Sequence, residues 1–110
     1  MKNFEAIIDL ADTSRSDKDA DKTVTKVFEG ERRRLISIRL GNNAVLPKHK
    51  APEPITVLCL DGEGTFYAGK DLEESQKMKR GTLVTLAADV EHEARAEPEL
   101  HLLVTRFIGD

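Results

Sequence analysis

Residues 47–64 of the chain read PKHKAPEPITVLCLDGEG: a histidine, two prolines flanking an acid, an apolar run and a Gly-Glu-Gly turn. Within the apolar run, Ile55 to Leu60, both alternating sets of side chains are apolar, apart from one threonine. Alternate side chains of a β-strand point to opposite faces, so this strand should be covered on both sides. One cover would be an opposing sheet, and the other would be a second subunit, the N-terminal segment or an outer strand. For this reason we expect a homodimer.

The segments around this stretch are also typical of β-strands. TVTKVF and RLISIRL are rich in β-branched residues and are separated by a Gly-centred segment at 29–31, which predicts a hairpin. ITVLCL and TFYAG predict a second hairpin about residues 61–64, and TLVTLAA, VEHEARA and LHLLVTRFI predict further strands. Residues 71–80 carry too few apolar side chains for a packed helical face, so a loop or short strand is expected there. The pattern predicts an all-β sandwich or barrel.

The length of the chain limits its organisation. A chain of 110 residues has room for one domain with one core. Between residues 13 and 22 no apolar residue is larger than alanine, so this stretch should be a solvated connection. We therefore predict an N-terminal segment and charged linker at 1–22 and a single β-barrel domain at 23–110.

Composition and charge exclude several classes of partner. The net charge of -3 argues against binding to nucleic acid or to an anionic membrane surface, which needs a clustered basic excess. No apolar run approaches the roughly 20 residues that span a membrane, and charged residues interrupt the first ten positions, where a secretory signal would lie. Cys59 is the only cysteine, so no disulfide forms within one chain. These features favour a cytoplasmic protein.

The segments from Gly41 to Gly62 and from Gly81 to His92, with histidines at 49 and 92, resemble the two motifs of the cupin family, a group of small β-barrel proteins. The first family motif has the form G-x5-H-x-H-x3,4-E-x6-G, and here Gly41 opens it and Gly62 closes it. The second has the form G-x5-P-x-G-x2-H-x3-N, in which Gly81 stands at the first glycine and His92 at the histidine. The resemblance covers residues 30–108 and implies an all-β fold, a small cupin-type double-stranded β-helix or jelly-roll barrel.

The resemblance also implies where a metal would lie. In metal-binding cupins three histidines and a glutamate converge on one divalent ion. Their places in this chain hold Pro47, His49, Ile55 and His92. Two of the four ligands are thus replaced, and two imidazoles alone bind a divalent ion weakly.

Glu53 and His101 are the candidates for a third ligand. Glu53 has the strand parity of Ile55, but the prolines on both sides of it favour a position above the barrel rather than inside it. His101 points inward with His92 only if the turn after Ala96 has an even number of residues. The sequence leaves the orientation of His101 open.

Three functions follow as hypotheses. The first, which we favour because two ligands are missing, is a homodimeric barrel that binds a small molecule without a tightly held metal. Its pocket would be lined by Pro47, His49, Ile55, Val57, Cys59 and His92. The second is a metal-dependent enzyme of the oxygenase or isomerase type, in which His49, His92 and a third ligand hold iron, zinc, manganese or nickel. The third is a structural or partner-binding barrel.

Overall fold

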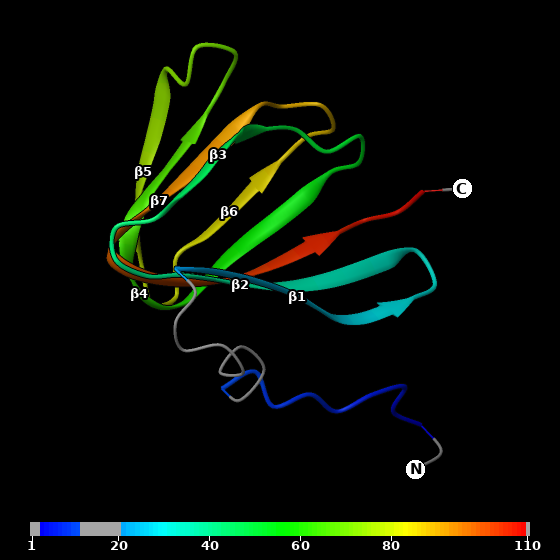
Figure 1. Ribbon diagram of the computed structural model, residues 1–110. Coiled ribbons are helices and arrows are strands. Elements are labelled where there is room, and N and C mark those ends of the chain that lie inside the picture. Colours follow the sequence, from blue (N-terminus) through cyan, green and yellow to red (C-terminus); the bar gives the residue numbers. More distant parts are fainter. Residues whose placement is uncertain (1–2, 12–20, 110) are drawn as a thin grey trace.

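The computed structural model describes residues 3–11 and 21–109, and within them all regular structure is β-strand (Figure 1). The strands are β1 (Lys22–Gly30), β2 (Arg33–Leu40), β3 (Val45–His49), β4 (Ile55–Ala68), β5 (Glu74–Lys79), β6 (Leu83–Leu86) and β7 (His92–Arg106). All of their pairings are antiparallel. The predicted all-β fold is confirmed, and residues 71–80 contain the short strand β5. Within these described ranges no helix is long and apolar enough to cross a membrane.

The first predicted hairpin is present. β1 pairs with β2 from Lys22 opposite Leu40 to Gly30 opposite Arg33, with a register shift between Lys26 and Phe28. The turn falls one step later than the sequence indicated, because Arg32 adopts a positive φ of 64° there. The charged linker that we predicted at 13–22 lies almost entirely outside the described residues, so its boundary stays a prediction.

The second predicted hairpin is wrong, and so is the turn expected after Ala96. β4 runs as one strand through residues 61–64, and β7 runs as one strand through 97–99. The register between them shifts at Cys59/Asp61 and again at Gly62/Gly64, and Gly62 has a φ of 82°. A glycine with positive φ inside a strand marks a bulge, which bends a strand without reversing it. The Gly-Glu-Gly segment is therefore a bend in a continuous strand.

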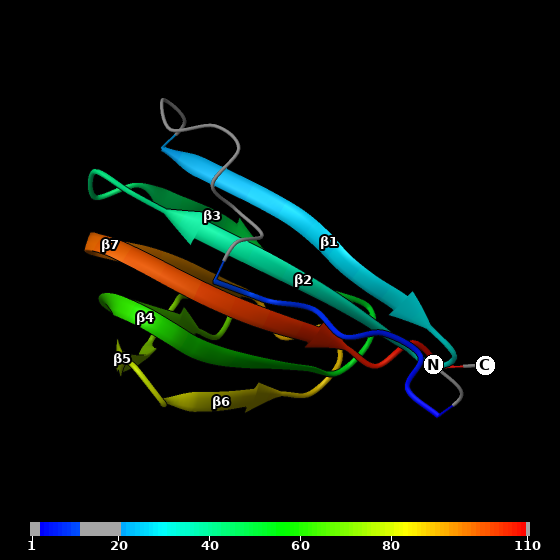
Figure 2. The ribbon, with the colours of Figure 1, turned by 90° about the horizontal axis from the view of Figure 1, so that it is seen from below.

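The two bent strands join two layers (Figures 1 and 2). The first layer contains β1, β2, the C-terminal half of β7, the N-terminal half of β4 and β6. The second contains β3, the N-terminal half of β7, the C-terminal half of β4 and β5. The core lies between the layers and includes Leu40, Val57, Phe66, Met78 and Leu102. Each long strand thus contributes side chains to the interior from both layers.

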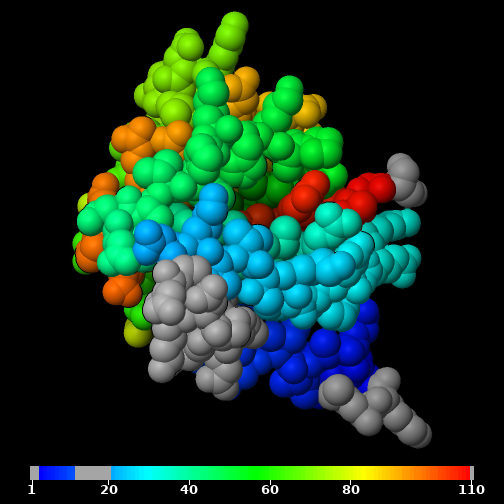
Figure 3. All heavy atoms as spheres, in the orientation of Figure 1, coloured from blue at the N-terminus to red at the C-terminus, as the bar shows by residue number. Residues whose placement is uncertain are grey.

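The N-terminal segment lies against the outer face of the first layer, beside β2. The guanidinium of Arg33 lies 2.8 Å from the Glu5 carboxylate, and Arg39 donates a 3.3 Å hydrogen bond to the carbonyl of Ala11. Figures 2 and 3 show this segment, in dark blue, on the side of β1 and β2 away from the second layer. The N-terminal segment, one of the covers that the sequence allowed for residues 55–60, thus contacts β2 of the same layer.

Candidate functional site

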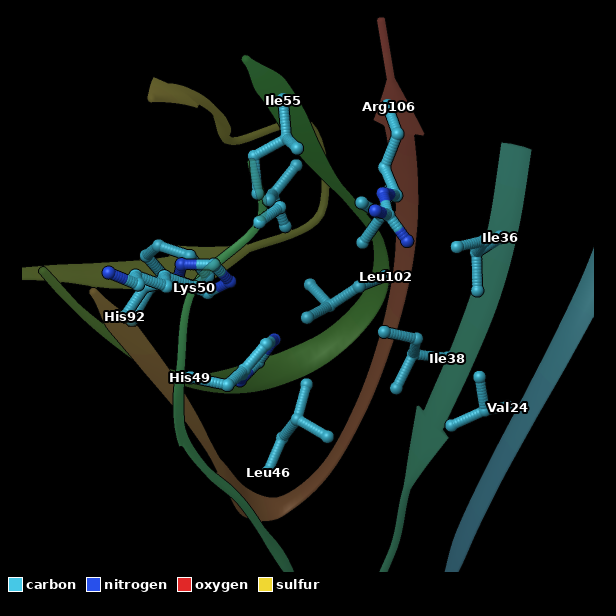
Figure 4. A pocket seen from close by; sticks show the side chains of 14 residues that line it. Val24, Ile36, Ile38, Leu46, His49, Lys50, Ile55, His92, Leu102 and Arg106 are labelled. Carbon is cyan, nitrogen blue, oxygen red and sulfur yellow. The ribbon is translucent and has the colours of Figure 1, made fainter. Parts of the chain in front are cut away.

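A cavity of about 220 Å³ lies between the two layers (Figure 4). Its apolar lining is Val24, Ile36, Ile38, Leu46, Ala51, Ile55, Val57, Phe66, Leu102 and Val104. Its polar lining is His49, Lys50, His92 and Arg106. Alternation along β2 and β7 sends Ile36, Ile38, Leu102 and Val104 inward, so the strand pattern itself produces the apolar wall.

His49 and His92 lie side by side on one wall of this cavity. They are direct partners across the pairing of β3 with β7, and their ring centroids are 4.2 Å apart with the planes at 61°. His92 is buried and stacks on Phe66 at 5.6 Å, whereas His49 is exposed at the rim. In Figure 4 both rings face the interior from the side opposite Ile36 and Val24 of the first layer. The structure thus brings the two predicted histidines together on one wall of the cavity.

Backbone carbonyls fix the hydrogen-bonding roles of the two rings. Nδ1 of His49 donates to the carbonyl of Pro47 at 2.8 Å, and Nδ1 of His92 donates to that of Val90 at 3.0 Å. Each neutral ring then carries its proton on Nδ1 and leaves Nε2 as an acceptor. Burial lowers the pKa of His92, against the smaller raising effect of its bond to Val90, which favours the neutral ring. The pair thus presents two Nε2 lone pairs that have no partner among the described residues.

Arg106 occupies another part of the cavity wall. Its Nε donates a 2.6 Å hydrogen bond to Oε1 of Glu53, and its guanidinium forms an ion pair with the same carboxylate. Both side chains are largely buried, with 27% and 17% of their areas exposed. The carboxylate neutralises the guanidinium, so Arg106 closes the cavity edge as one half of an ion pair.

The other predicted pocket residues divide into two groups. Ile55 and Val57 are buried and line the cavity, as expected from their strand parity. Pro47 is exposed and contributes its carbonyl to His49 rather than a surface to the cavity. Cys59 is buried in the core beside the bend, where Sγ donates to the carbonyl of Asp61 at 3.4 Å, and burial raises the pKa of its thiol. Cys59 is therefore a core residue outside the lining.

The structure places neither candidate third ligand beside the two histidines. His101 lies on the outer face of the first layer, where its Nε2 is hydrogen-bonded to Oγ of Ser37 at 2.8 Å. The inward orientation that we considered for His101 is corrected, because β7 is continuous and no turn pairs Ala96 with this residue. Glu53 is committed to Arg106. Among the described residues no group of three or more His, Cys, Asp or Glu side chains gathers around a common point.

The donor set at this site does not fit a tightly held metal. Stable metal sites in proteins have three or more protein ligands, and here the places of the missing two hold an exposed proline and a buried isoleucine. His49 and His92 supply two imidazole nitrogens only. The chemistry that they can perform unaided is hydrogen bonding and proton exchange with a bound molecule.

Sequence reasoning did not name ten of the residues that line this cavity, among them Lys50, Phe66 and Arg106. The inward orientation of Arg106 could have been predicted, because it has the same strand parity as Leu102 and Val104 and so points inward with them. Its partner Glu53 carried a further signal, because a carboxylate near a barrel interior needs a counter-charge. Phe66 has the same strand parity as Gly64. The bend between Cys59 and Gly64 changes which alternate residues face inward, so the inward face of Phe66 could not be derived from the first half of β4.

Comparisons with known proteins place the fold. No family model matches the chain, and no curated protein matches its sequence significantly. A cupin superfamily protein from Desulfitobacterium hafniense aligns over 96% of this chain and 94% of its own, at a TM-score of 0.79 and 11% identity. A protein with a double-stranded β-helix domain from Klebsiella pneumoniae aligns over 94% of this chain and 90% of its own, at a TM-score of 0.80 and 14% identity.

A third similar structure is an RmlC-like cupin family protein with a double-stranded β-helix fold from Methanocaldococcus jannaschii. It aligns over 86% of this chain and 88% of its own, at a TM-score of 0.71 and 21% identity. Likeness at this level of identity concerns the fold alone. The predicted double-stranded β-helix is confirmed.

Proposed function

We propose that this chain, a cupin-type double-stranded β-helix, binds a small and largely apolar organic molecule between its layers. His49 and His92 would hold one hydroxyl or carboxylate group of that molecule. The observation that carries this proposal is the imidazole pair on the wall of an otherwise apolar cavity. An apolar pocket with a few convergent polar groups is the usual form of a small-molecule site.

The size and chemistry of the cavity narrow the class of ligand. Its volume of about 220 Å³ lies below the roughly 300–1,000 Å³ of sites for drug-sized molecules, which favours a small metabolite. Neutral Nε2 atoms accept hydrogen bonds, so the neutral pair suits a hydroxyl group. When one ring is protonated it donates instead, and then a carboxylate is favoured. The Lys50 side chain at the cavity adds positive charge on the same side.

The test is ligand-observed NMR on the wild-type protein with a panel of small aliphatic alcohols and carboxylic acids. We expect saturation transfer to the apolar protons of binders, and a loss of affinity of about tenfold in His92→Phe, which removes the Nε2 acceptor but keeps a ring of similar size. His101→Gln is the matched control, because it changes a buried histidine on the other face of the same strand. Its affinity for the alcohols of the panel should equal that of the wild type.

Two results would overturn the proposal. One is the absence of any binder in the panel while circular dichroism shows a folded protein. The other is equal affinity in the wild type and in His92→Phe, which would place the ligand elsewhere. An equal loss in His101→Gln would show that the effect arises from destabilisation of the fold.

A metal-dependent enzyme is the second candidate, favoured by the two adjacent Nε2 lone pairs. Two imidazoles give weak binding, so we expect far less than one metal per chain by mass spectrometric elemental analysis of untagged protein purified without chelator. A content near one iron, zinc, manganese or nickel per chain that disappears in His92→Ala would reverse the order of the two candidates. Oxygenase and isomerase assays would then come first.

A further inference from the structure

A second cavity, of about 360 Å³, lies on the outer face of the first layer, away from the histidine pair. Leu10 and Ala11 of the N-terminal segment and Leu60 of β4 form its apolar part. Its charged and titratable lining is Arg39, Asp61, Arg80 and His101. The pairing of β2, β7 and β4 creates this cluster, because His101 stands opposite Arg39 on one side and Asp61 on the other.

The two arginines at this cavity lack acidic partners. In the part of the chain that the structure describes, neither Arg39 nor Arg80 forms an ion pair, and Nε of Arg39 is buried with no acceptor. The hydrogen bond from Arg39 to the carbonyl of Ala11 is long, at 3.3 Å. A buried charged donor without an acceptor is costly and calls for an explanation. Nε of Arg34 is also unsatisfied, but that guanidinium pairs with Glu29 and lines neither cavity.

His101 is a further polar residue in the lining of the same cavity. Its Nε2 is bonded to the buried hydroxyl of Ser37 at 2.8 Å. When the hydroxyl donates to Nε2, the ring proton is on Nδ1, which has no partner among the residues described. Burial, assisted by Arg39, lowers the pKa of His101 to about 4, so at neutral pH the ring is uncharged. The histidine therefore places an uncharged ring beside two guanidinium charges.

We propose that the outer cavity binds a small organic oxyanion, with its carboxylate or phosphate group between Arg39 and Arg80. A guanidinium presents its donors as a planar fork that matches the oxygens of either group. The oxyanion supplies the acceptor that Nε of Arg39 lacks, and Leu10 and Leu60 contact its apolar part. Asp61 faces the same space and weakens the attraction for anions, so it limits the site to ligands that reach both arginines. This site is independent of the cavity between the layers.

The experiment titrates ¹⁵N-labelled protein with inorganic phosphate, acetate and chloride at matched ionic strength and pH 7.5, and follows amide and arginine Nε–H resonances. We expect saturable shifts at Leu10, Ala11, Leu60 and Nε–H of Arg39 with phosphate or acetate, and none with chloride. Comparison of the two oxyanions tells a phosphate site from a carboxylate site. The amide of His92 should not move, which separates this site from the one between the layers.

Three variants test the assignment. Arg39→Gln and Arg80→Gln should each weaken oxyanion binding about tenfold, whereas Arg34→Gln, on the same strand as Arg39, should not change it. Asp61→Asn should strengthen binding several-fold. Arg80 is exposed, so its variant keeps the test valid if Arg39→Gln fails to fold. Equal shifts with chloride, or unchanged affinity in Arg80→Gln, would overturn the proposal.

Discussion

At the scale of single residues, the cavity between the layers depends on an ion pair as well as on its histidines. Glu53 and Arg106 neutralise each other at the cavity edge, and both are mostly buried. We expect Glu53→Gln to lower the free energy of unfolding by about 1 to 2 kcal/mol, because Arg106 is left without its counter-charge. Urea denaturation followed by circular dichroism measures this. The control is Glu97→Gln, which breaks the exposed ion pair with Lys77 and should lower the free energy of unfolding much less than Glu53→Gln.

His101 gives the protein a pH-dependent stability. Its pKa is about 4 in the folded protein and near 6.5 in the unfolded chain, so between these values the unfolded state binds more protons. The free energy of unfolding should therefore fall as the pH drops from 6.5 toward 4, by up to about 3 kcal/mol from this residue, and should not depend on it above 6.5. His92, whose pKa is also lowered, acts in the same direction. Urea titrations at several pH values should show that the free energy of unfolding depends less steeply on pH in His101→Gln than in the wild type. An unchanged pH dependence would contradict this account.

The individual residues show what the sequence was able to reveal. Alternation placed Ile55, Val57 and His92 on the cavity wall, because within one half of a strand parity is reliable. Alternation did not predict the direction of the His101 side chain, because that direction depends on whether the chain turns or continues at residues 97–99. The acceptor state of His49 and His92 depends on carbonyls of Pro47 and Val90, which only the folded backbone brings into position.

At the scale of elements, the bend in β4 depends on two glycines. A Cβ at Gly64 would lie 2.2 Å from the carbonyl oxygen of Arg95, a backbone atom of the paired strand that cannot move aside. We expect Gly64→Ala to lower the free energy of unfolding by about 3 kcal/mol or more. Thermal and urea denaturation test this against Gly41→Ala, where the new Cβ would have an ordinary contact at 4.0 Å. Equal stabilities of the two variants would show that the bend tolerates a side chain.

The same glycines explain why two elements were predicted wrongly. A Gly-Glu-Gly segment after an apolar run is typical of a hairpin turn and also of a bulge, and local sequence does not separate the two. What decides between them is the pairing of residues 55–68 with 92–106, which lie far apart in the chain. The β1–β2 hairpin was predictable because its two strands are adjacent and its pairing is local.

At the scale of the whole molecule, the homodimer stays a prediction. Apolar side chains that the fold leaves exposed include Val24 on β1 and Leu83 on β6, with 56% and 60% of their areas accessible. β1 and β6 each pair with a single strand, so these residues lie at the two edges of the first layer. We expect size-exclusion chromatography with light scattering to give twice the chain mass of 12.3 kDa. A monomer mass at all concentrations tested would contradict this expectation.

The continuity of β4 and β7 through both layers has a consequence for how the protein opens. Neither layer can separate from the rest without breaking hydrogen bonds of a strand that also belongs to the other layer. Partial unfolding of one layer alone is thereby disfavoured, and amide protons in the middle of both long strands should exchange with solvent only when the whole domain unfolds. The paired residues of β4 and β7 are far apart in the sequence, so these two strands should pair more slowly than the local β1–β2 hairpin forms. The two strands that shape the cavity therefore also determine the lifetime of the folded state.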